Sequence, residues 1–306
     1  SCDTLTIVTI PDSVLTIDYA AFSSCTALTS ITIGHNVTTI GNGAFDSCVS
    51  LTSVTIPNNV ITIGNFSFIS CSSLATITIG DRVTTIGNYA FESCSALTSV
   101  IIPDNVTTIG RYAFYNCTTL TSISIGNSLS TIGNYAFSYC TILPSIMIPS
   151  SVTSIGAYVF QYCTSLTAIT VDDTNTHYSS INGVLYNKDI TTLIQCPAGK
   201  TDPISIPNTV DTIGKAAFFS CVSLTDIIIP SHVDTIGDYA FSYCPLTTVT
   251  IPNSVITIGV SAFAYTPITS VTIGSSINAI SNYAFTSCAS LNSITFYGLV
   301  APPYVG

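Results

Sequence analysis

Residues 28–48 read LTSITIGHNVTTIGNGAFDSC, and this stretch decides the fold because close copies of it fill the chain. The copies keep the spacing of Leu, Ile, Val, Ala, Phe and Cys, with Thr, Ser, Asn and Gly between them. A fixed period of this length is the signature of a solenoid, in which each repeat makes one turn of a coil. Successive cysteines of the first half lie 23 residues apart: Cys2, Cys25, Cys48, Cys71, Cys94, Cys117, Cys140 and Cys163.

Each repeat is predicted to contain two short strands. Residues 28–33 end in alternating apolar positions and are rich in β-branched side chains, as expected of a strand. Gly34 ends this strand, and residues 37–40 form a second extended piece. The segment that follows, 88–94 in a later copy, is too short for a regular helix. We expect it to form one helical or 3₁₀ turn that buries its Ala and Phe.

The predicted fold is a right-handed, β-dominated coil whose parallel strands stack along the axis. A single 23-residue repeat cannot bury its own apolar face, so neighbouring repeats must share one core. The large apolar side chains, at roughly 1.5–3 kcal/mol each, offset the ordering of the chain only through this stacking. We expect a single domain over residues 1–306, divided into regular repeats at 1–168 and 204–298, an irregular island at 169–203 and a C-terminal tail at 299–306.

The island breaks the regular spacing. It begins with a polar loop that carries Asp172 and Asp173, and residues 184–195 suggest a β-hairpin. Residues 195–197 also resemble the end of an ordinary repeat, so a hairpin and a distorted turn are both open. Insertions in a solenoid map to one face and often carry function, but a tolerated loop is the more common interpretation of such a segment.

The twelve cysteines are predicted to be mostly buried free thiols. No C-x-x-C pair, the usual spacing of zinc ligands, occurs in the chain. In-register Cβ atoms on adjacent turns would stay about 5 Å apart, farther than the 3.5–4.5 Å that a disulfide needs. We therefore expect no disulfide and no metal site, and we expect the thiols to act as small packing groups.

Charge excludes several classes of partner. Five Lys and Arg stand against fifteen Asp and Glu, a formal net charge of −10. Nucleic acids and anionic membrane surfaces need clustered cations, and no apolar run approaches the roughly 18 residues of a membrane span. We expect no nucleic-acid partner and no membrane insertion by this chain. No signal-peptide pattern is present and the chain begins inside a repeat, so we expect a fragment of a longer protein.

The unit Cys-x-x-Leu-Thr-Ser-Ile-Thr-Ile-Pro-x-x-Val-x-x-Ile-Gly-x-x-Ala-Phe resembles the BspA-like, Treponema pallidum-type leucine-rich repeat. The resemblance covers essentially the whole chain, and residues 180–189 look like an insertion that recurs in that family. It implies a leucine-rich-repeat solenoid of an extracellular or cell-surface protein, with a role in adhesion to host matrix, host cells or other microbes. The family offers no catalytic residues that could be carried over.

The residues themselves also argue against an enzyme. Gly199-Lys200-Thr201 resembles the end of a phosphate loop, but Ile194 stands where that motif needs Gly. The three histidines lie in separate turns, and neither G-x-S-x-G nor H-E-x-x-H occurs. We predict no catalytic residues and no cofactor.

Two rows of side chains are the candidate binding face. Outward-pointing strand residues make a mostly hydroxyl row with two apolar members: Thr32, Thr55, Thr78, Ile101, Ser124, Met147 and Thr170. Two residues before each Phe lies an aromatic row: Tyr89, Tyr112, Tyr135 and Tyr158. Tyr is enriched at interfaces because it combines a large buried area with a polar tip, although stacked rings would also simply cover the edge of the coil.

The leading hypothesis is a non-enzymatic binding or adhesion module that recognises a host or microbial surface protein, matrix or glycan. The alternative is a structural spacer that presents another domain at the cell surface. Ice binding by the Thr rows is a third hypothesis, which the irregular register of the Thr residues disfavours.

Overall fold

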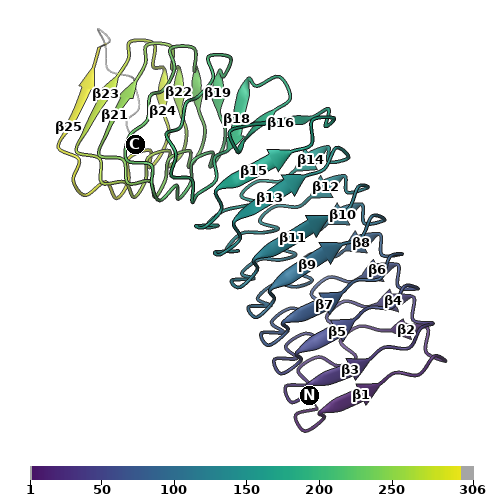
Figure 1. Cartoon of the computed structure of the whole chain (residues 1–306). Helices are drawn as coiled ribbons and strands as arrows, with labels where there is room; N and C mark the ends of the chain where they lie inside the picture. The colour runs from purple at the N-terminus through teal and green to yellow at the C-terminus, as the bar shows by residue number, and fades with distance from the viewer. Residues whose placement is uncertain (1, 298–306) are drawn as a thin grey trace. The chain divides into compact units, whose positions relative to one another are not determined.

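The computed structural model describes residues 2–297 and shows a coil in which most turns contribute two short strands (Figure 1). Internal contacts divide the chain into two compact units, residues 1–163 and 164–306. The predicted solenoid of 23-residue repeats with parallel stacked strands is confirmed, as in-register pairs 23 residues apart show. The predicted tail at 299–306 lies outside the described residues, and cooperative unfolding as a single domain stays a prediction.

The N-terminal unit contains two columns of short strands, which correspond to the two strands predicted per repeat. Equivalent residues pair across neighbouring rungs, as Val54 does with Ile77. The first column consists of β1 (Ile7–Thr9), β3 (Ser30–Thr32), β5 (Ser53–Thr55), β7 (Thr76–Thr78), β9 (Ser99–Ile102), β11 (Ser122–Ile125) and β13 (Ser145–Ile148). The second consists of β2 (Thr16–Ile17), β4 (Thr39–Ile40), β6 (Thr62–Ile63), β8 (Thr85–Ile86), β10 (Thr108–Ile109), β12 (Thr131–Ile132) and β14 (Ser154–Ile155).

The alternation of side chains along each first-column strand decides what faces the core. Ile31 and Ile33 are buried, whereas Thr32 between them is exposed. Successive side chains of a strand point to opposite faces, so Ile31 and Ile33 enter the coil and Thr32 leaves it.

The segment before each cysteine forms no helix anywhere in residues 2–297, contrary to the predicted helical or 3₁₀ turn. Two residues per rung, Tyr89 and Ser93 for example, have φ of 59° and 57°, which interrupts a right-handed helical path. Backbone N–H groups donate alternately within the rung and to the next one. Glu92 N donates to Tyr89 O at 3.3 Å, and Phe91 N donates to Ala113 O at 2.8 Å. Hydrogen bonds between rungs thus replace those of a helix.

Buried aromatic rings form the centre of the N-terminal core. Phe45, Phe68, Phe91 and Phe114 are fully buried and stack with ring centroids 5.1–5.3 Å apart. Each buried ring contributes roughly 1.5–3 kcal/mol. The stack also fixes the rungs in register because an offset of one residue would place polar side chains inside.

Most of the cysteines form the buried ladder that the sequence predicts, and the described cysteines are free thiols; Cys2 is exposed and Cys288 is half-buried. Cys94 Sγ donates to the carbonyl oxygen of Phe68 at 3.2 Å, and Cys117 Sγ donates to that of Phe91 at 3.3 Å. These two thiols therefore join their own rung to the preceding Phe rung, a role more specific than the packing predicted from the sequence.

The C-terminal unit repeats this architecture less regularly. Residues 227–229 are not a strand, although Ile227 and Ile229 are buried. The carboxylate of Asp226 accepts the N–H of Ile227 at 2.9 Å and so removes a donor from the strand ladder. The regular strands of this unit are β15 (Ala168–Val171), β19 (Thr212–Ile213), β20 (Thr235–Ile236), β21 (Thr248–Ile251), β22 (Thr257–Ile258), β23 (Ser270–Ile273), β24 (Ala279–Ile280) and β25 (Ser293–Phe296).

The island forms three strands, β16 (Tyr178–Ile181), β17 (Val184–Asn187) and β18 (Thr192–Gln195). β17 pairs antiparallel with β18, which confirms the hairpin, and β18 then pairs parallel with β19 and rejoins the coil. β16 was not predicted; it pairs antiparallel with β17, to which the turn Asn182-Gly183 connects it. Both turn residues have positive φ, 50° and 77°, as a type I′ turn requires.

Candidate functional site

The strand-face residues predicted in the N-terminal unit lie where the sequence places them, on the outside of the first-column strands. Thr55 pairs with Thr78, and Ile101 pairs with Ser124, in the register of the sheet. Thr32 and Met147 also lie on these strands, and all six residues are exposed. The structure therefore brings them together as one row, here called the strand face, which consists of Thr32, Thr55, Thr78, Ile101, Ser124 and Met147.

Not every Thr of the unit is available to a partner. The hydroxyls of Thr52 and Thr121 donate to backbone carbonyls 23 residues earlier, at 3.3 and 2.9 Å, and thereby extend the ladder between rungs. In contrast, the hydroxyls of Thr32, Thr55 and Thr78 have no hydrogen-bond partner among residues 2–297. The strand face thus offers free donors and acceptors, whereas the neighbouring Thr row serves the fold.

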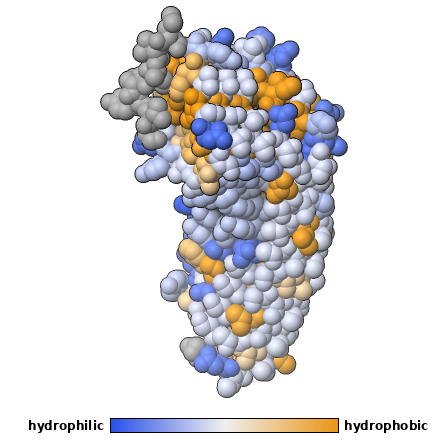
Figure 2. All heavy atoms as spheres, turned by 90° about the vertical axis from the view of Figure 1, so that its left-hand side faces the viewer, coloured by the Kyte–Doolittle hydropathy of each residue, from blue (hydrophilic) through white to orange (hydrophobic). Residues whose placement is uncertain are grey.

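Two large apolar side chains interrupt the strand face. Ile101 is 71% exposed and Met147 is 56% exposed, with Ser124 between their rungs. The face seen in Figure 2 shows the same character in the N-terminal unit, in its lower part: weakly polar atoms dominate and apolar side chains form separate spots. Such a surface combines anchoring apolar groups with polar surroundings, as binding interfaces do.

The C-terminal unit carries its own members of this row. Thr170 is exposed, as predicted. Ile228, which occupies the equivalent position and is 81% exposed, was not among the residues predicted for this row. The sequence contains the information needed to predict it. Ile228 follows Cys221 by seven residues, and each strand-face residue follows the cysteine of its repeat by the same number.

The predicted aromatic row forms a stack along the side of the N-terminal unit. Ring centroids from Phe66 through Tyr89, Tyr112 and Tyr135 to Tyr158 lie 4.7, 4.9, 4.7 and 4.9 Å apart. This set is called the aromatic ladder below. Its rings cover one another's faces, so the four Tyr residues are half-buried and present their edges to solvent.

The backbone under the ladder is unusual for aromatic residues. Phe66, Tyr89, Tyr112, Tyr135 and Tyr158 all have φ between 56° and 59°. The left-handed region costs a residue with a side chain roughly 1–2 kcal/mol. Stacking contributes about 0.5–1.5 kcal/mol per pair, so it offsets much of that cost.

A second aromatic row was missed by the sequence analysis. It lies one or two residues after the buried Phe, and Tyr139 and Tyr162 approach to 4.4 Å between ring centroids. Tyr115 meets Tyr139 edge-on at 5.4 Å. The recurrence of Tyr at this offset is a signal that the sequence contains.

The thiols of Cys117 and Cys163 are poor nucleophiles at neutral pH. Burial raises the pKa of Cys117 and of Cys163 to about 12, so both remain protonated. In the described part of the chain, no group of three or more His, Cys, Asp and Glu side chains is placed to hold a metal ion.

Two charged residues of the island, Asp172 and Lys188, are engaged with the island itself. The hydroxyl and N–H of Thr174 donate to Asp172, and these hydrogen bonds lower the pKa of that carboxyl. Lys188 Nζ donates to the carbonyl oxygen of Asn175. These contacts favour the interpretation of the island as a structural loop.

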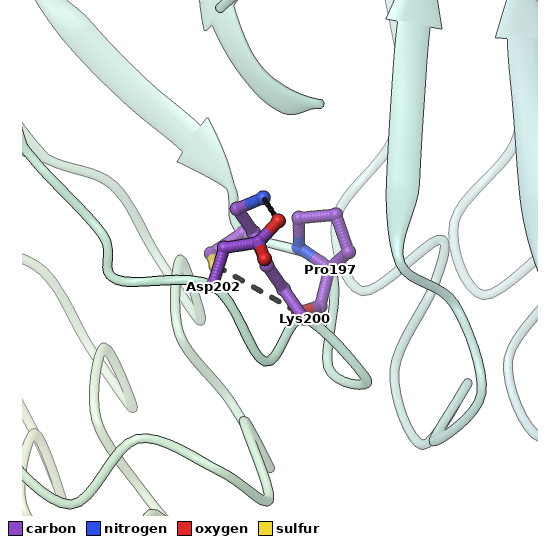
Figure 3. Close-up of polar contacts among 4 residues, drawn as sticks. Pro197, Lys200 and Asp202 are labelled. Atoms are coloured by element: carbon purple, nitrogen blue, oxygen red, sulfur yellow. Dashed lines mark hydrogen bonds and ion pairs between the residues drawn. The ribbon is translucent and has the colours of Figure 1, made fainter. Parts of the chain in front are cut away.

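Lys200, part of the sequence that resembles a phosphate loop, is also used internally. Figure 3 shows its side chain turned toward Asp202, and the Nζ to Oδ2 distance is 3.2 Å. The Lys200 side chain is only 7% exposed, whereas that of Asp202 is 80% exposed. A lysine held in this way is not presented to a phosphate.

Comparison with known proteins identifies the family. The model described as BspA type leucine rich repeat region matches residues 1–103, 84–201 and 195–301. This chain belongs to the BspA-type leucine-rich repeat family. No curated protein matches it.

Several solved structures are similar to this BspA-type protein. A leucine rich cell surface protein from Faecalibacterium prausnitzii is 33% identical, with a TM-score of 0.82 over 96% of this chain and 88% of that one. A leucine-rich repeat protein from Bacteroides ovatus is 28% identical, with a TM-score of 0.64 over 96% and 79%. The pneumococcal vaccine antigen PcpA, at 24% identity and a TM-score of 0.75 over 96% and 78%, shares the fold. None of the described residues forms a helix long and apolar enough to cross a membrane.

Proposed function

We propose that this BspA-type protein is a non-enzymatic binding or adhesion module at a cell surface, and that the strand face of its N-terminal unit contacts the partner. The observation that carries the proposal is the row of exposed, in-register Thr32, Thr55 and Thr78, whose hydroxyls the fold does not use. The partner is a surface protein, a matrix protein or a glycan of a host or another microbe.

The chemistry of the face supports this role. An extended row of hydroxyls with Ile101 and Met147 offers many weak contacts, and their number rather than their individual strength gives affinity. The protonated thiols of Cys117 and Cys163 and the engaged side chains of Asp172 and Lys188 support a role that is not enzymatic. The description of the Faecalibacterium relative as a cell surface protein supports a location outside the cell.

Direct binding tests the proposal. The purified chain is titrated over a panel of immobilised extracellular-matrix proteins, a panel of immobilised glycans and intact epithelial cells, with detection by surface plasmon resonance or flow cytometry. We expect saturable binding to at least one of them that an excess of unlabelled chain displaces. A spacer, whose role is only to hold another domain, binds none of them.

A further inference from the structure

Arg111 differs from the other four cations of this chain. Each of those four lies against a carboxylate, carbonyl or amide oxygen: Arg82, Lys188, Lys200 and Lys215. The guanidinium of Arg111 instead meets only the phenol of Tyr112 among the polar side-chain groups of residues 2–297. In a chain of formal net charge −10, this exposed cation therefore has no acidic partner in the part that the structure describes.

The aromatic ladder holds the guanidinium in place. Cζ of Arg111 lies 4.7 Å from the ring centroid of Tyr112, and Nη2 donates to the phenol oxygen at 3.4 Å. The Tyr112 ring is itself fixed between Tyr89 and Tyr135, at centroid distances of 4.9 and 4.7 Å. At the base of the side chain, Arg111 N donates to Oδ1 of Asn88 in the rung below, at 2.7 Å. A charged group that is held in this way loses little conformational entropy when it binds a partner.

Arg111 and Tyr112 together present hydrogen-bond donors. A guanidinium has five N–H donors and no acceptor, and only the one from Nη2 is used within residues 2–297. The phenol oxygen of Tyr112 accepts that bond, so its own O–H remains to be donated, and no acceptor for it lies in the same range. The hydrogen bond to Tyr112 raises the pKa of Arg111, and the neighbouring phenols of the ladder raise it further. The pair is thus positively charged at every physiological pH.

An anion fits this pair of donors. A carboxylate is planar and accepts two hydrogen bonds side by side, the arrangement that a guanidinium favours. The negative net charge of the chain opposes the approach of an anion. Charges farther from Arg111 than about 8 Å are however largely screened at physiological ionic strength.

The surroundings favour a sugar over a protein as the source of the carboxylate. The rings of the ladder cover one another's faces, so little apolar area is left for a protein side chain to bury. The exposed groups next to Arg111 are polar. Asn88 uses its Oδ1 for Arg111 N, and its NH₂ group has no partner among residues 2–297; the Tyr89 hydroxyl has none there either. Sugar hydroxyls both donate and accept hydrogen bonds and match such groups.

We propose that Arg111 and Tyr112 bind the carboxylate of an acidic sugar, a sialic or uronic acid of a glycan, and that Asn88 and Tyr89 contact its hydroxyls. Arg111 follows β10 of the second strand column, whereas the strand face lies on the first column. This is therefore an additional binding site, and it goes beyond the proposed function.

Ligand-observed saturation-transfer NMR with the whole chain tests the proposal. The probes are the methyl glycosides of N-acetylneuraminic acid and of glucuronic acid, which distinguish the two kinds of acidic sugar. Their uncharged methyl esters are the matched comparisons, and N-acetylglutamate amide represents a protein carboxylate. We expect at least one acidic sugar to bind with a Kd on the order of 1 mM, and its ester to bind at least ten-fold more weakly. Higher ionic strength should weaken the binding because an exposed ion pair is screened.

Two substitutions that remove the same charge locate the site. Arg111→Asn introduces the residue that the neighbouring rungs carry at this position, as at Asn88, so the variant should fold and lose binding of the acidic sugar at least ten-fold. Arg82→Asn is the matched control, because Asn59 stands at its equivalent position in the rung below. It should bind as the original chain does. Melting temperatures establish that both variants are folded.

Tyr112→Phe tests the phenol separately. Phe66 shows that the ladder accepts a ring without a hydroxyl, so the stack should persist while one donor is lost. We expect this variant to bind the acidic sugar about three-fold or more weakly than the original chain.

Four outcomes overturn the proposal. They are that neither acidic sugar binds, that the methyl esters bind as tightly as the acids, that Arg111→Asn binds as well as Arg82→Asn, or that the glutamate amide binds more tightly than both sugars. The last outcome would mean that the site takes an acidic side chain of a protein. Because the strand face uses other residues, failure of this proposal leaves the proposed function standing.

Discussion

The thiol of Cys71 donates a hydrogen bond of 3.2 Å to the carbonyl oxygen of Phe45, which lies 26 residues earlier and one turn below. That same carbonyl accepts the backbone N–H of Cys48 at 3.3 Å. One oxygen of the buried Phe column thus joins two rungs. The contact recurs along the ladder and explains why a cysteine is used at a position where any small apolar side chain would fill the space.

Removal of this thiol should destabilise the fold. We expect Cys71→Ala to lower the free energy of unfolding by about 1–2 kcal/mol, since it deletes a hydrogen bond and leaves a small cavity. Cys2→Ala is the control, because Cys2 is exposed and its loss should change stability by less than about 0.5 kcal/mol. Urea denaturation followed by circular dichroism measures both. Equal stabilities of the two variants would contradict the role assigned to the ladder.

The buried thiols also predict how stability depends on alkaline pH. Burial raises the pKa of Cys117 and Cys163 from 9.0 to about 12, so between these pH values the folded chain keeps protons that the unfolded chain releases. Stability is therefore fully present below pH 9 and falls as pH rises toward 12, by about 1.4 kcal/mol per pH unit for each thiol.

The pH dependence is measured as the free energy of unfolding in urea from pH 7 to 11. Cys117→Ala removes one of these thiols, so the free energy of unfolding should decline less steeply above pH 9, by about 1.4 kcal/mol per pH unit. This change in slope is independent of the effect of the substitution on stability at pH 7. A free energy that stays constant up to pH 11 would show that the thiols are not shielded as the structure indicates.

Two glycines with different surroundings provide a test of rung spacing. A Cβ on Gly87 would lie 2.6 Å from Asn65 N in the rung below, whereas one on Gly43 would meet nothing closer than 3.9 Å. We expect Gly87→Ala to cost about 2–3 kcal/mol because backbone must move, and Gly43→Ala to cost about 1 kcal/mol through its positive φ. Thermal melts compare them. If Gly87→Ala is the milder of the two, the rungs are farther apart than described.

The ion pairs Lys200–Asp202 and Lys215–Asp238 should respond differently when the carboxylate is removed. Asp202→Asn leaves Lys200 charged and only 7% exposed, which should cost about 1–3 kcal/mol. Asp238→Asn affects a pair whose side chains are 50% and 41% exposed, at 3.9 Å, and should cost less than about 1 kcal/mol. Chemical denaturation at low and high salt measures both. A larger effect at Asp238 would contradict the burial of Lys200.

Periodicity predicts much of this fold. The 23-residue spacing alone places Val54 beside Ile77 and predicts a shared core, because a repeat of this size has no other way to bury its apolar side. It does not predict the backbone of the turns. Tyr and Ser rarely adopt positive φ. The residue types at Tyr89 and Ser93 therefore do not predict the conformation that hydrogen bonds between rungs impose.

The candidate site was predictable in part. Alternation along the strands predicts that Thr55 faces solvent, but the sequence does not separate its free hydroxyl from that of Thr52, which donates to the rung below. That distinction depends on whether the hydroxyl lies within hydrogen-bonding distance of a backbone carbonyl oxygen in the neighbouring rung, as that of Thr52 does with Thr29 O. In the island, the pair Asn182-Gly183 carries a readable hairpin signal, and recognising it would have predicted β16.

The central claim is that the strand face of the N-terminal unit contacts the partner. The direct test uses the matrix protein, glycan or cell that the chain binds best and compares two triple variants of equal charge. Thr32→Asp, Thr55→Asp and Thr78→Asp together place three carboxylates on the strand face. Thr26→Asp, Ser73→Asp and Ser128→Asp together place three on exposed turns of the same unit.

The measurement is the equilibrium Kd of the original chain and of both variants, each shown to be folded by its melting temperature. Three desolvated carboxylates in an uncharged interface should weaken binding by the strand-face variant at least ten-fold, while the turn variant stays within about two-fold of the original chain. Unchanged binding by the strand-face variant, or equal weakening of both, would contradict the assignment of this face as the binding surface.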